Sequence, residues 1–233
     1  MIRQGMIYDN IVFGKYDINK FNKFYPYIKN YLKNIEKIKV LDVGGGEGHL
    51  LDLFLKKLKE DFNNGPYINS EFHMVDISKR QVEMAKEKGY NAIIYDISKG
   101  FPYDDESFDI IFVSEVIEHI FDTTTFLKEC NRILKKDGIM VLTTPNIASI
   151  GNRINLLFFG KRPGCIDCKL ENSSGHIRAF DINDIESLLN LAKFRIIKIT
   201  GLKVNLRNSK QYNNINLKLG DVFPTLSIIL SPL

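Results

Sequence analysis

The strongest chemical pattern in this 233-residue chain consists of four glycines and three aspartates near the ends of short apolar runs. The first apolar run, Lys39–Val43, contains Asp42 and leads into the turn Gly-Gly-Gly-Glu-Gly48, with a helical stretch directly behind it. Glycines in such a turn let the backbone bend sharply and let a ligand approach without a Cβ in the way. The other two aspartates, Asp76 and Asp96, end later runs, and a carboxylate at the position of Asp76 can accept hydrogen bonds from both ribose hydroxyls.

These residues need a scaffold that brings strand ends together, and the rest of the chain predicts one. Short apolar runs alternate with helix-like segments, which predicts a doubly wound α/β fold, with a mainly parallel sheet and helices on both faces. In this Rossmann-like architecture the ligand crevice lies beyond the carboxyl ends of the strands, where the glycine turn lies. The expected strands are Lys39–Val43, Phe72–Val75, Ala92–Tyr95, Asp109–Ser114, Ile139–Thr143 and Arg195–Gly201.

Apolar stripes and capping residues predict the helices between those strands. Ser78 with Gln81 predicts a capping box before a helix over 79–88, and Asp181 is the expected N-cap of a later helix. A stripe from Phe126 to Leu134 predicts another helix, followed by two lysines and a terminating Gly138.

Length and composition fit one domain over residues 1–233. Segments 1–35, rich in aromatic residues, and 146–180 fall outside the alternation and are expected to form lids over the cleft. The net charge of +4 is spread over helical lysines, so no nucleic-acid groove is expected. No apolar run approaches the roughly 18 to 20 residues of a membrane span, and the N-terminus lacks the pattern of a secretory signal. A cytoplasmic monomer or homodimer is therefore expected.

The spacing of the glycines distinguishes two kinds of nucleotide site. Dinucleotide sites follow G-x-G-x-x-G, whereas this turn reads Asp42-x-Gly44-x-Gly46-x-Gly48. It resembles the first motif of the class I S-adenosylmethionine-dependent methyltransferases, an acidic residue followed by G-x-G-x-G. The resemblance implies S-adenosylmethionine as the cofactor, with its methionine portion lined by Asp42 and by Gly44, Gly45, Gly46 and Gly48.

Further motifs similar to that family follow in the expected order over roughly residues 40–200. By the resemblance Asp76 and Ile77 belong to the ribose end of the site, and Asp96 accepts from the adenine amino group while Ile97 packs on the ring. An Asp that simply opens a turn is the alternative for Asp96.

The stretch 101–119 resembles the fourth-strand motif of the branch of small-molecule and ubiquinone-biosynthesis-like methyltransferases. It implies that Ser114 and Glu115 face the cofactor. The similarity continues through 131–146 and reappears in Gly175-His-Ile-Arg-Ala-Phe180.

Methyl transfer from a sulfonium is a direct displacement, so positioning and removal of water supply much of the catalysis. An oxygen acceptor, the favoured interpretation, also needs a base. His119 follows the fourth strand, and an imidazole with a pKa of about 6.5 suits that role. His176 is the second candidate for catalysis, and Arg178 is the candidate for binding an acidic or phenolic small-molecule acceptor. Structural roles for all three remain open.

Three other functions are compatible with parts of this sequence. A nicotinamide-dependent oxidoreductase is disfavoured by the glycine spacing and by Asp96, and a non-catalytic S-adenosylmethionine-binding protein is disfavoured by the candidate acceptor-site residues. A nucleic-acid methyltransferase of the base-amine type would carry an Asn/Asp-Pro-Pro-aromatic motif after the fourth strand, where this chain has Ser114-Glu-Val-Ile.

Two features near the end of the chain depart from simple expectations. Cys165 and Cys168 have a spacing that suits zinc, but no fourth ligand is evident, so no metal is expected. Pro232 argues against a clean central strand over the last residues, so an atypical sheet edge is expected. Either Leu202–Leu206 supplies that edge, or the last strand is shortened or absent, and a partner subunit is a candidate to cover the edge.

Overall fold

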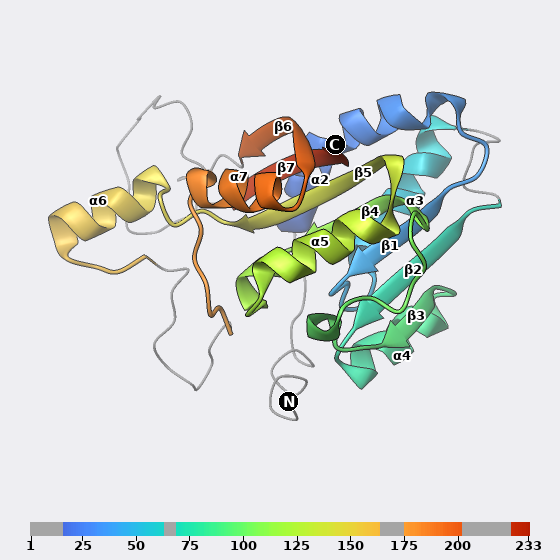
Figure 1. Cartoon of the computed structure of the whole chain (residues 1–233), viewed down its shortest axis with the longest axis horizontal. Helices are drawn as coiled ribbons and strands as arrows, with labels where there is room; N and C mark the ends of the chain where they lie inside the picture. The colour runs from blue at the N-terminus through green and yellow to red at the C-terminus, as the bar shows by residue number, and fades with distance from the viewer. Residues whose placement is uncertain (1–15, 63–68, 164–174, 202–224) are drawn as a thin grey trace.

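A seven-stranded sheet runs through the computed structural model, which describes residues 16–62, 69–163, 175–201 and 225–233 (Figure 1). The strand order is β3-β2-β1-β4-β5-β7-β6. The predicted doubly wound α/β fold is confirmed. The strands are β1 (Lys39–Val43), β2 (Glu71–Asp76), β3 (Asn91–Ile94), β4 (Phe108–Ser114), β5 (Leu134–Pro145), β6 (Phe194–Gly201) and β7 (Thr225–Pro232).

The first five strands are parallel, and this brings their carboxyl ends to one edge of the sheet. β1 lies at the centre and pairs with both β2 and β4, so that Asp42 is opposite Met74 on one side and Phe112 on the other. β3 extends the sheet beyond β2, and β5 extends it beyond β4. The central strands β1 and β4 are almost continuously buried because helices cover both faces.

Helices pack on the two faces around separate apolar clusters. One cluster joins α2, α3 and α4 to the sheet, and the other joins α5 and α7 to the opposite face, which is the nearer one in Figure 1. The helices are α2 (Tyr16–Tyr31), α3 (His49–Asp61), α4 (Lys79–Glu87), α5 (Thr123–Ile133), α6 (Ile150–Phe159) and α7 (Ile182–Leu191); short 3-10 turns are η1 (Leu32–Asn34), η2 (Ile97–Lys99) and η3 (Ile117–His119).

The predicted N-caps are present, but only one bond of the predicted Ser78–Gln81 capping box is formed, because the Ser78 amide donates to Asp76 instead of to the Gln81 side chain. The Ser78 hydroxyl accepts from the Gln81 backbone amide at 3.3 Å, at the start of α4. Asp181 and Asp184 form a reciprocal capping box at the start of α7, with both bonds at 2.9 Å. Each cap satisfies backbone amides that have no partner within the helix, and so fixes where the helix begins.

The predicted end of the helix before the fifth strand is wrong. α5 ends at Ile133, and β5 begins at Leu134 and continues through Gly138. Leu134 is buried opposite Phe108 of β4, so strand pairing overrides its place in the helical stripe. Gly138 lies within the strand because the backbone passes Leu134 closely: a Cβ there would lie 2.6 Å from the Leu134 Cδ1 atom.

The expectation of a disrupted seventh strand is also wrong. β7 is antiparallel and lies between β5 and β6, with Ile228 opposite Leu142 on one side and Ile199 on the other. The buried apolar residues of β7 are paired on both sides, whereas Pro232 is only the last residue of the strand, where a missing N–H costs little. The alternative edge over 202–206 lies outside the described residues.

The two expected lid segments contain one helix each in the described ranges. α2 buries Phe21 and Phe24 against the sheet, with the Phe24 ring 5.9 Å from that of Phe112, so this part of segment 1–35 belongs to the core. α6 extends away from the body of the molecule (Figure 1). Residues 1–15 and 164–174 lie outside the described residues, so the lid assignment stays a prediction. None of the described helices is long and apolar enough to cross a membrane.

Candidate functional site

The turn after β1 can be built only with glycine at several positions. Gly44, Gly46 and Gly48 have φ angles of +64°, +56° and +77°. This left-handed backbone conformation is unfavourable for any residue that has a Cβ atom. A Cβ on Gly44 would also lie 2.7 Å from the Val116 Cγ2 atom, and one on Gly48 would lie 2.9 Å from the Tyr90 ring. The turn therefore presents bare backbone at the carboxyl edge of the sheet.

Asp42 lies directly beneath this turn. Its side chain is buried, and a Cβ on Gly45 would come within 2.7 Å of its Oδ2 atom. Burial, and to a lesser extent the charge of Asp76, raises the pKa of Asp42 well above its ordinary value. Within the described part of the chain, Oδ2 has no hydrogen-bond partner. The turn thus covers a carboxyl group for which the neutral form is favoured.

Asp76 joins the end of β2 to the glycine turn. Its Oδ2 atom accepts from the Gly46 amide at 3.0 Å, and its Oδ1 atom accepts from the Ser78 amide at 2.8 Å. Each carboxylate oxygen can accept a further hydrogen bond. Ile77 follows and is partly buried. The carboxylate that is predicted to accept from the ribose therefore lies at the carboxyl edge of the sheet, and it also holds the glycine turn in place.

Asp96 and Ile97 follow β3 at the same edge. Asp96 caps η2 by accepting from the Ser98 amide at 3.1 Å and from the Ser98 hydroxyl at 2.6 Å. Ile97 packs against the apolar cluster of the α5 face and lines a cavity of about 240 Å³. Ile120 and Phe121 also line this cavity. The turn-forming role of Asp96 is visible in these contacts, and its adenine role stays a prediction.

Ser114 and Glu115 end β4 and are tied to β5. The Thr143 hydroxyl donates to the Glu115 Oε1 atom at 2.8 Å and lies 3.1 Å from the Ser114 hydroxyl. Glu115 has a φ of +56°, which is strained for a residue with a side chain. Its amide donates to the Thr143 carbonyl at 3.0 Å, so Thr143 holds this conformation. Thr143 was not predicted from the sequence, where it is one more residue of an apolar run.

The two candidate histidines, far apart in the sequence, lie together in the structure. The ring centroids of His119 and His176 are 4.8 Å apart. His119 Nδ1 lies 3.0 Å from the Gly175 carbonyl oxygen, which can only accept, so Nδ1 carries the proton and the acceptor lone pair of the neutral ring lies on Nε2. Burial, aided by the neighbouring His176, lowers the pKa of His119 below its ordinary value of 6.5.

Glu118 lies between the histidines and the sheet and was missed at the sequence level. Its side chain is 1% exposed, its Oε2 atom accepts from the Thr144 hydroxyl at 3.1 Å, and its Oε1 atom lies 3.8 Å from His176 Nε2. Ligand atoms of Glu118, His119 and His176 all lie within 4.8 Å of one another, a spacing that could hold a divalent cation. Cys165 and Cys168 lie outside the described residues.

Arg178 holds the turn that carries His119. Its Nε donates to the Ile120 carbonyl at 3.2 Å, and its Nη2 donates to the Phe121 carbonyl. Its backbone amide donates to the Glu118 carbonyl at 3.1 Å. These contacts give Arg178 a positioning role, while the predicted contact with an acceptor stays untested.

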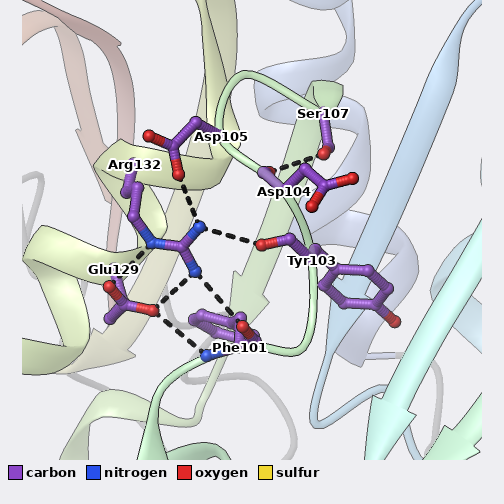
Figure 2. A network of polar contacts seen from close by, with 7 residues as sticks. All are labelled: Phe101, Tyr103, Asp104, Asp105, Ser107, Glu129 and Arg132. Atoms are coloured by element: carbon purple, nitrogen blue, oxygen red, sulfur yellow. Dashed lines mark hydrogen bonds and ion pairs between the residues drawn. The ribbon is translucent and has the colours of Figure 1, made fainter.

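A second arginine fixes the loop between η2 and β4 (Figure 2). Arg132 of α5 donates to the carbonyl oxygens of Phe101 and Tyr103, at 3.2 and 2.8 Å, and forms an ion pair with Asp105 at 2.7 Å. It also forms a two-pronged pair with Glu129, with both bonds at 2.8 Å, which lowers the pKa of Glu129. The loop beside Ile97 is therefore anchored to α5.

A second cavity lies at the other end of the sheet. It measures about 610 Å³ and lies between α2 and the β5–β7–β6 side, lined among others by Tyr27, Lys136 and Arg195. None of the predicted site residues lines it. The chemistry of the strand ends, not the cavity size, identifies the candidate site.

The sequence family described as "Methyltransferase domain" matches residues 16–199, most of the chain. The chain belongs to this family. The resemblance to the class I methyltransferases is thereby confirmed, and the family supports S-adenosylmethionine as the cofactor. The bare glycine turn and the buried Asp42 oxygen without a described partner fit such a ligand.

Curated relatives of this methyltransferase match it over part of their length. A ubiquinone biosynthesis O-methyltransferase from Pelagibacter ubique is 32% identical over 123 residues, which are 51% of this chain and 47% of that protein. The uncharacterized methyltransferase YcgJ of Bacillus subtilis is 33% identical over 110 residues, which are 45% of this chain and 39% of that protein. The chain thus spans less than half the length of these relatives.

Solved structures support the fold. A SAM dependent methyltransferase from Archaeoglobus fulgidus aligns with a TM-score of 0.60 at 21% identity, covering 94% of this chain and 95% of that one. At this identity the likeness supports the Rossmann-like architecture of the methyltransferase and nothing finer.

Proposed function

We propose that this methyltransferase transfers the methyl group of S-adenosylmethionine to an oxygen nucleophile of a small molecule. The observation that carries the proposal is the 3.0 Å bond from the Gly46 amide to Asp76, which joins the bare turn of β1 to the end of β2. With this bond in place, the glycine turn and the end of β2 would form one continuous edge for the cofactor. The neutral imidazole of His119 follows β4, the strand next to β1 in the sheet.

The chain offers a residue for each part of the cofactor. The glycine turn would lie against the methionine portion, Asp76 would accept from the ribose hydroxyls, and Asp96 with Ile97 would hold adenine. Ser114 and Glu115, fixed by Thr143, would bound the crevice on the β4 side. When bound, S-adenosylmethionine supplies a methyl group activated by a sulfonium.

His119 is proposed as the base for the acceptor hydroxyl. The Gly175 carbonyl holds the Nδ1 proton, so Nε2 can take the proton of the acceptor. Burial favours the neutral ring, which is the form a base needs. His176 lies beside it, Glu118 bonds to Thr144 of β5, and Arg178 bonds to the carbonyls of residues 118, 120 and 121. The Pelagibacter relative's name makes hydroxylated aromatic compounds the first acceptors to test.

The cofactor role of Asp76 can be tested by calorimetry. Asp76→Ala is expected to weaken S-adenosylmethionine binding at least tenfold, or about 1.4 kcal/mol. Asp181→Ala, which removes a carboxylate from the start of α7, is the matched control and should leave the affinity unchanged. Circular dichroism would confirm that the variants remain folded, and Asp76→Asn would keep one amide bond to the turn. Unchanged affinity in both Asp76 variants would overturn the ribose assignment.

The base can be tested with a panel of phenolic acceptors, by measuring formation of S-adenosylhomocysteine. His119→Asn keeps a donor for the Gly175 carbonyl but removes the imidazole, so kcat should fall at least a hundredfold, on the order expected for a general base. Cofactor affinity should not change, and His73→Asn, on β2, is the control. Because burial lowers the pKa of His119, wild-type kcat/KM should decline only as the pH falls below 6.5. Cofactor binding without turnover on any acceptor would instead favour a non-catalytic binding protein.

A further inference from the structure

The last turn of α6 carries an exposed apolar surface. Leu156, Leu157, Phe158 and Phe159, here called the α6 tip, are 57%, 77%, 70% and 55% exposed. No residue of α6 is buried, and the helix extends away from the sheet (Figure 1). Isolated apolar side chains are common on protein surfaces, but four consecutive ones on a projecting helix indicate a contact surface.

The charges near the tip all have the same sign. Between residues 149 and 163 the charged side chains are Arg153, Lys161 and Arg162, and the segment contains no Asp or Glu. Arg153 is exposed one turn before the tip, and the Lys161 ammonium lies 5.8 Å from the Phe159 ring. The apolar surface is thus bordered by cations at both ends.

An apolar surface bordered by cations favours one kind of binding partner. In a symmetric contact between two copies, the same patch meets itself, which would bring these cations close to one another. A lipid surface with anionic headgroups accommodates both features, because apolar side chains enter the acyl boundary while Lys and Arg remain among the phosphates. With 10 residues, α6 is about 15 Å long and can rest in such an interface but not cross it.

The tip is attached to the same edge of the sheet as the candidate site. α6 begins shortly after the carboxyl end of β5. Asn146 forms a bridge with Phe180, and the Ile147 amide donates to the Phe180 carbonyl at 3.0 Å. The returning segment 175–180 ends at this bridge and carries Arg178. We propose that the α6 tip docks this methyltransferase on the surface of an anionic lipid bilayer, with the edge that carries His119 close to the headgroups.

Sedimentation of the full chain with vesicles tests the proposal without requiring methyl transfer. Vesicles of mixed phosphatidylglycerol and phosphatidylcholine should bind the protein at least tenfold more strongly than phosphatidylcholine alone, and added salt should reduce the difference. The double variant Leu157→Ser/Phe158→Ser should lose at least tenfold in partitioning. Its control, Leu191→Ser/Leu233→Ser, removes two exposed apolar side chains elsewhere and should partition like the wild type.

A second pair of double variants tests how much the positive charges near the tip contribute to vesicle binding. Arg153→Gln/Lys161→Gln should reduce binding about thirtyfold, since each basic residue near an anionic surface contributes about 1 kcal/mol and two are removed. Lys79→Gln/Lys136→Gln lowers the net charge equally at exposed sites far from α6 and should have little effect. Equal binding to both vesicle types, or equal losses in tip and control variants, would overturn the proposal. So would a dimer in solution that the Leu157→Ser/Phe158→Ser variant abolishes while vesicle binding persists. The tip variants should keep their S-adenosylmethionine affinity, so that a loss of vesicle binding can be distinguished from a failure of the proposed methyltransferase function.

Discussion

Replacing Gly44 by alanine should destabilise the fold through two separable effects. The first is the left-handed backbone at φ +64°, which costs a residue with a Cβ about 1–2 kcal/mol. The second is the new Cβ, which would lie 2.7 Å from the Val116 Cγ2 atom, an overlap of the kind that costs about 1–3 kcal/mol in a packed core. Together they predict a loss of about 2–5 kcal/mol, a large part of the stability of a typical domain.

Urea unfolding at equilibrium can separate these two effects. Gly89→Ala is the control for the backbone, because Gly89 has a φ of +90° but a Cβ added there would meet no atom within 4 Å. It should cost only about 1–2 kcal/mol. Val116→Ala removes the atom that the new methyl group would contact, so the Gly44→Ala/Val116→Ala variant should recover about 1–3 kcal/mol relative to the sum of the single variants.

Two results would refute this reasoning. If Gly44→Ala costs no more than Gly89→Ala, the close approach of the turn to Val116 does not exist. If the double variant shows no coupling, the loss comes from another contact. The same Gly44→Ala protein should also bind S-adenosylmethionine more weakly in calorimetry, because the turn would have to move.

Three further changes have expected outcomes. Because burial raises the pKa of Asp42 above 3.8, the folded state keeps a proton that the unfolded chain releases, and stability present at low pH is lost as pH rises toward the folded pKa. Asp42→Asn should therefore flatten the pH dependence of urea unfolding and raise stability at neutral pH; a steeper dependence would contradict this. Arg132→Met should cost about 1–3 kcal/mol by freeing two backbone carbonyls (Figure 2), whereas Lys128→Met on the same helix should be neutral in the same assay. Asp181→Ala should lower the melting temperature through loss of about 1 kcal/mol of capping, and an unchanged transition would exclude the capping role.

The part of the fold that local pattern determines could be predicted from the sequence. β1 was predicted with its observed limits, because a buried apolar run followed by a glycine turn leaves little freedom. Leu134, by contrast, fits both a helical stripe and a strand, and only its position opposite Phe108 decides between them. β7 depends on two neighbouring strands, and that pairing outweighs the proline at its end.

The candidate site also contains residues that local pattern predicts and residues that only long-range contacts determine. Glycines and aspartates at strand ends could be found from spacing alone, since their chemistry is local to each turn. Glu118 and Thr143 carry no such signal, because they matter through the register of β4 against β5 and through contacts with distant residues. The approach of His119 to His176 depends on the bond to Gly175, which no periodicity in the sequence encodes.

The position of β7 has a consequence for how the protein is made. This strand follows β6 in the chain but lies between β5 and β6 in the sheet, so neither neighbour is paired on that side until β7 has left the ribosome. Until then β5 offers an unpaired apolar edge to any other extended chain. Closure of the sheet is therefore a late event in synthesis. Until β7 pairs, the exposed edge of β5 must be either short-lived or shielded from other chains.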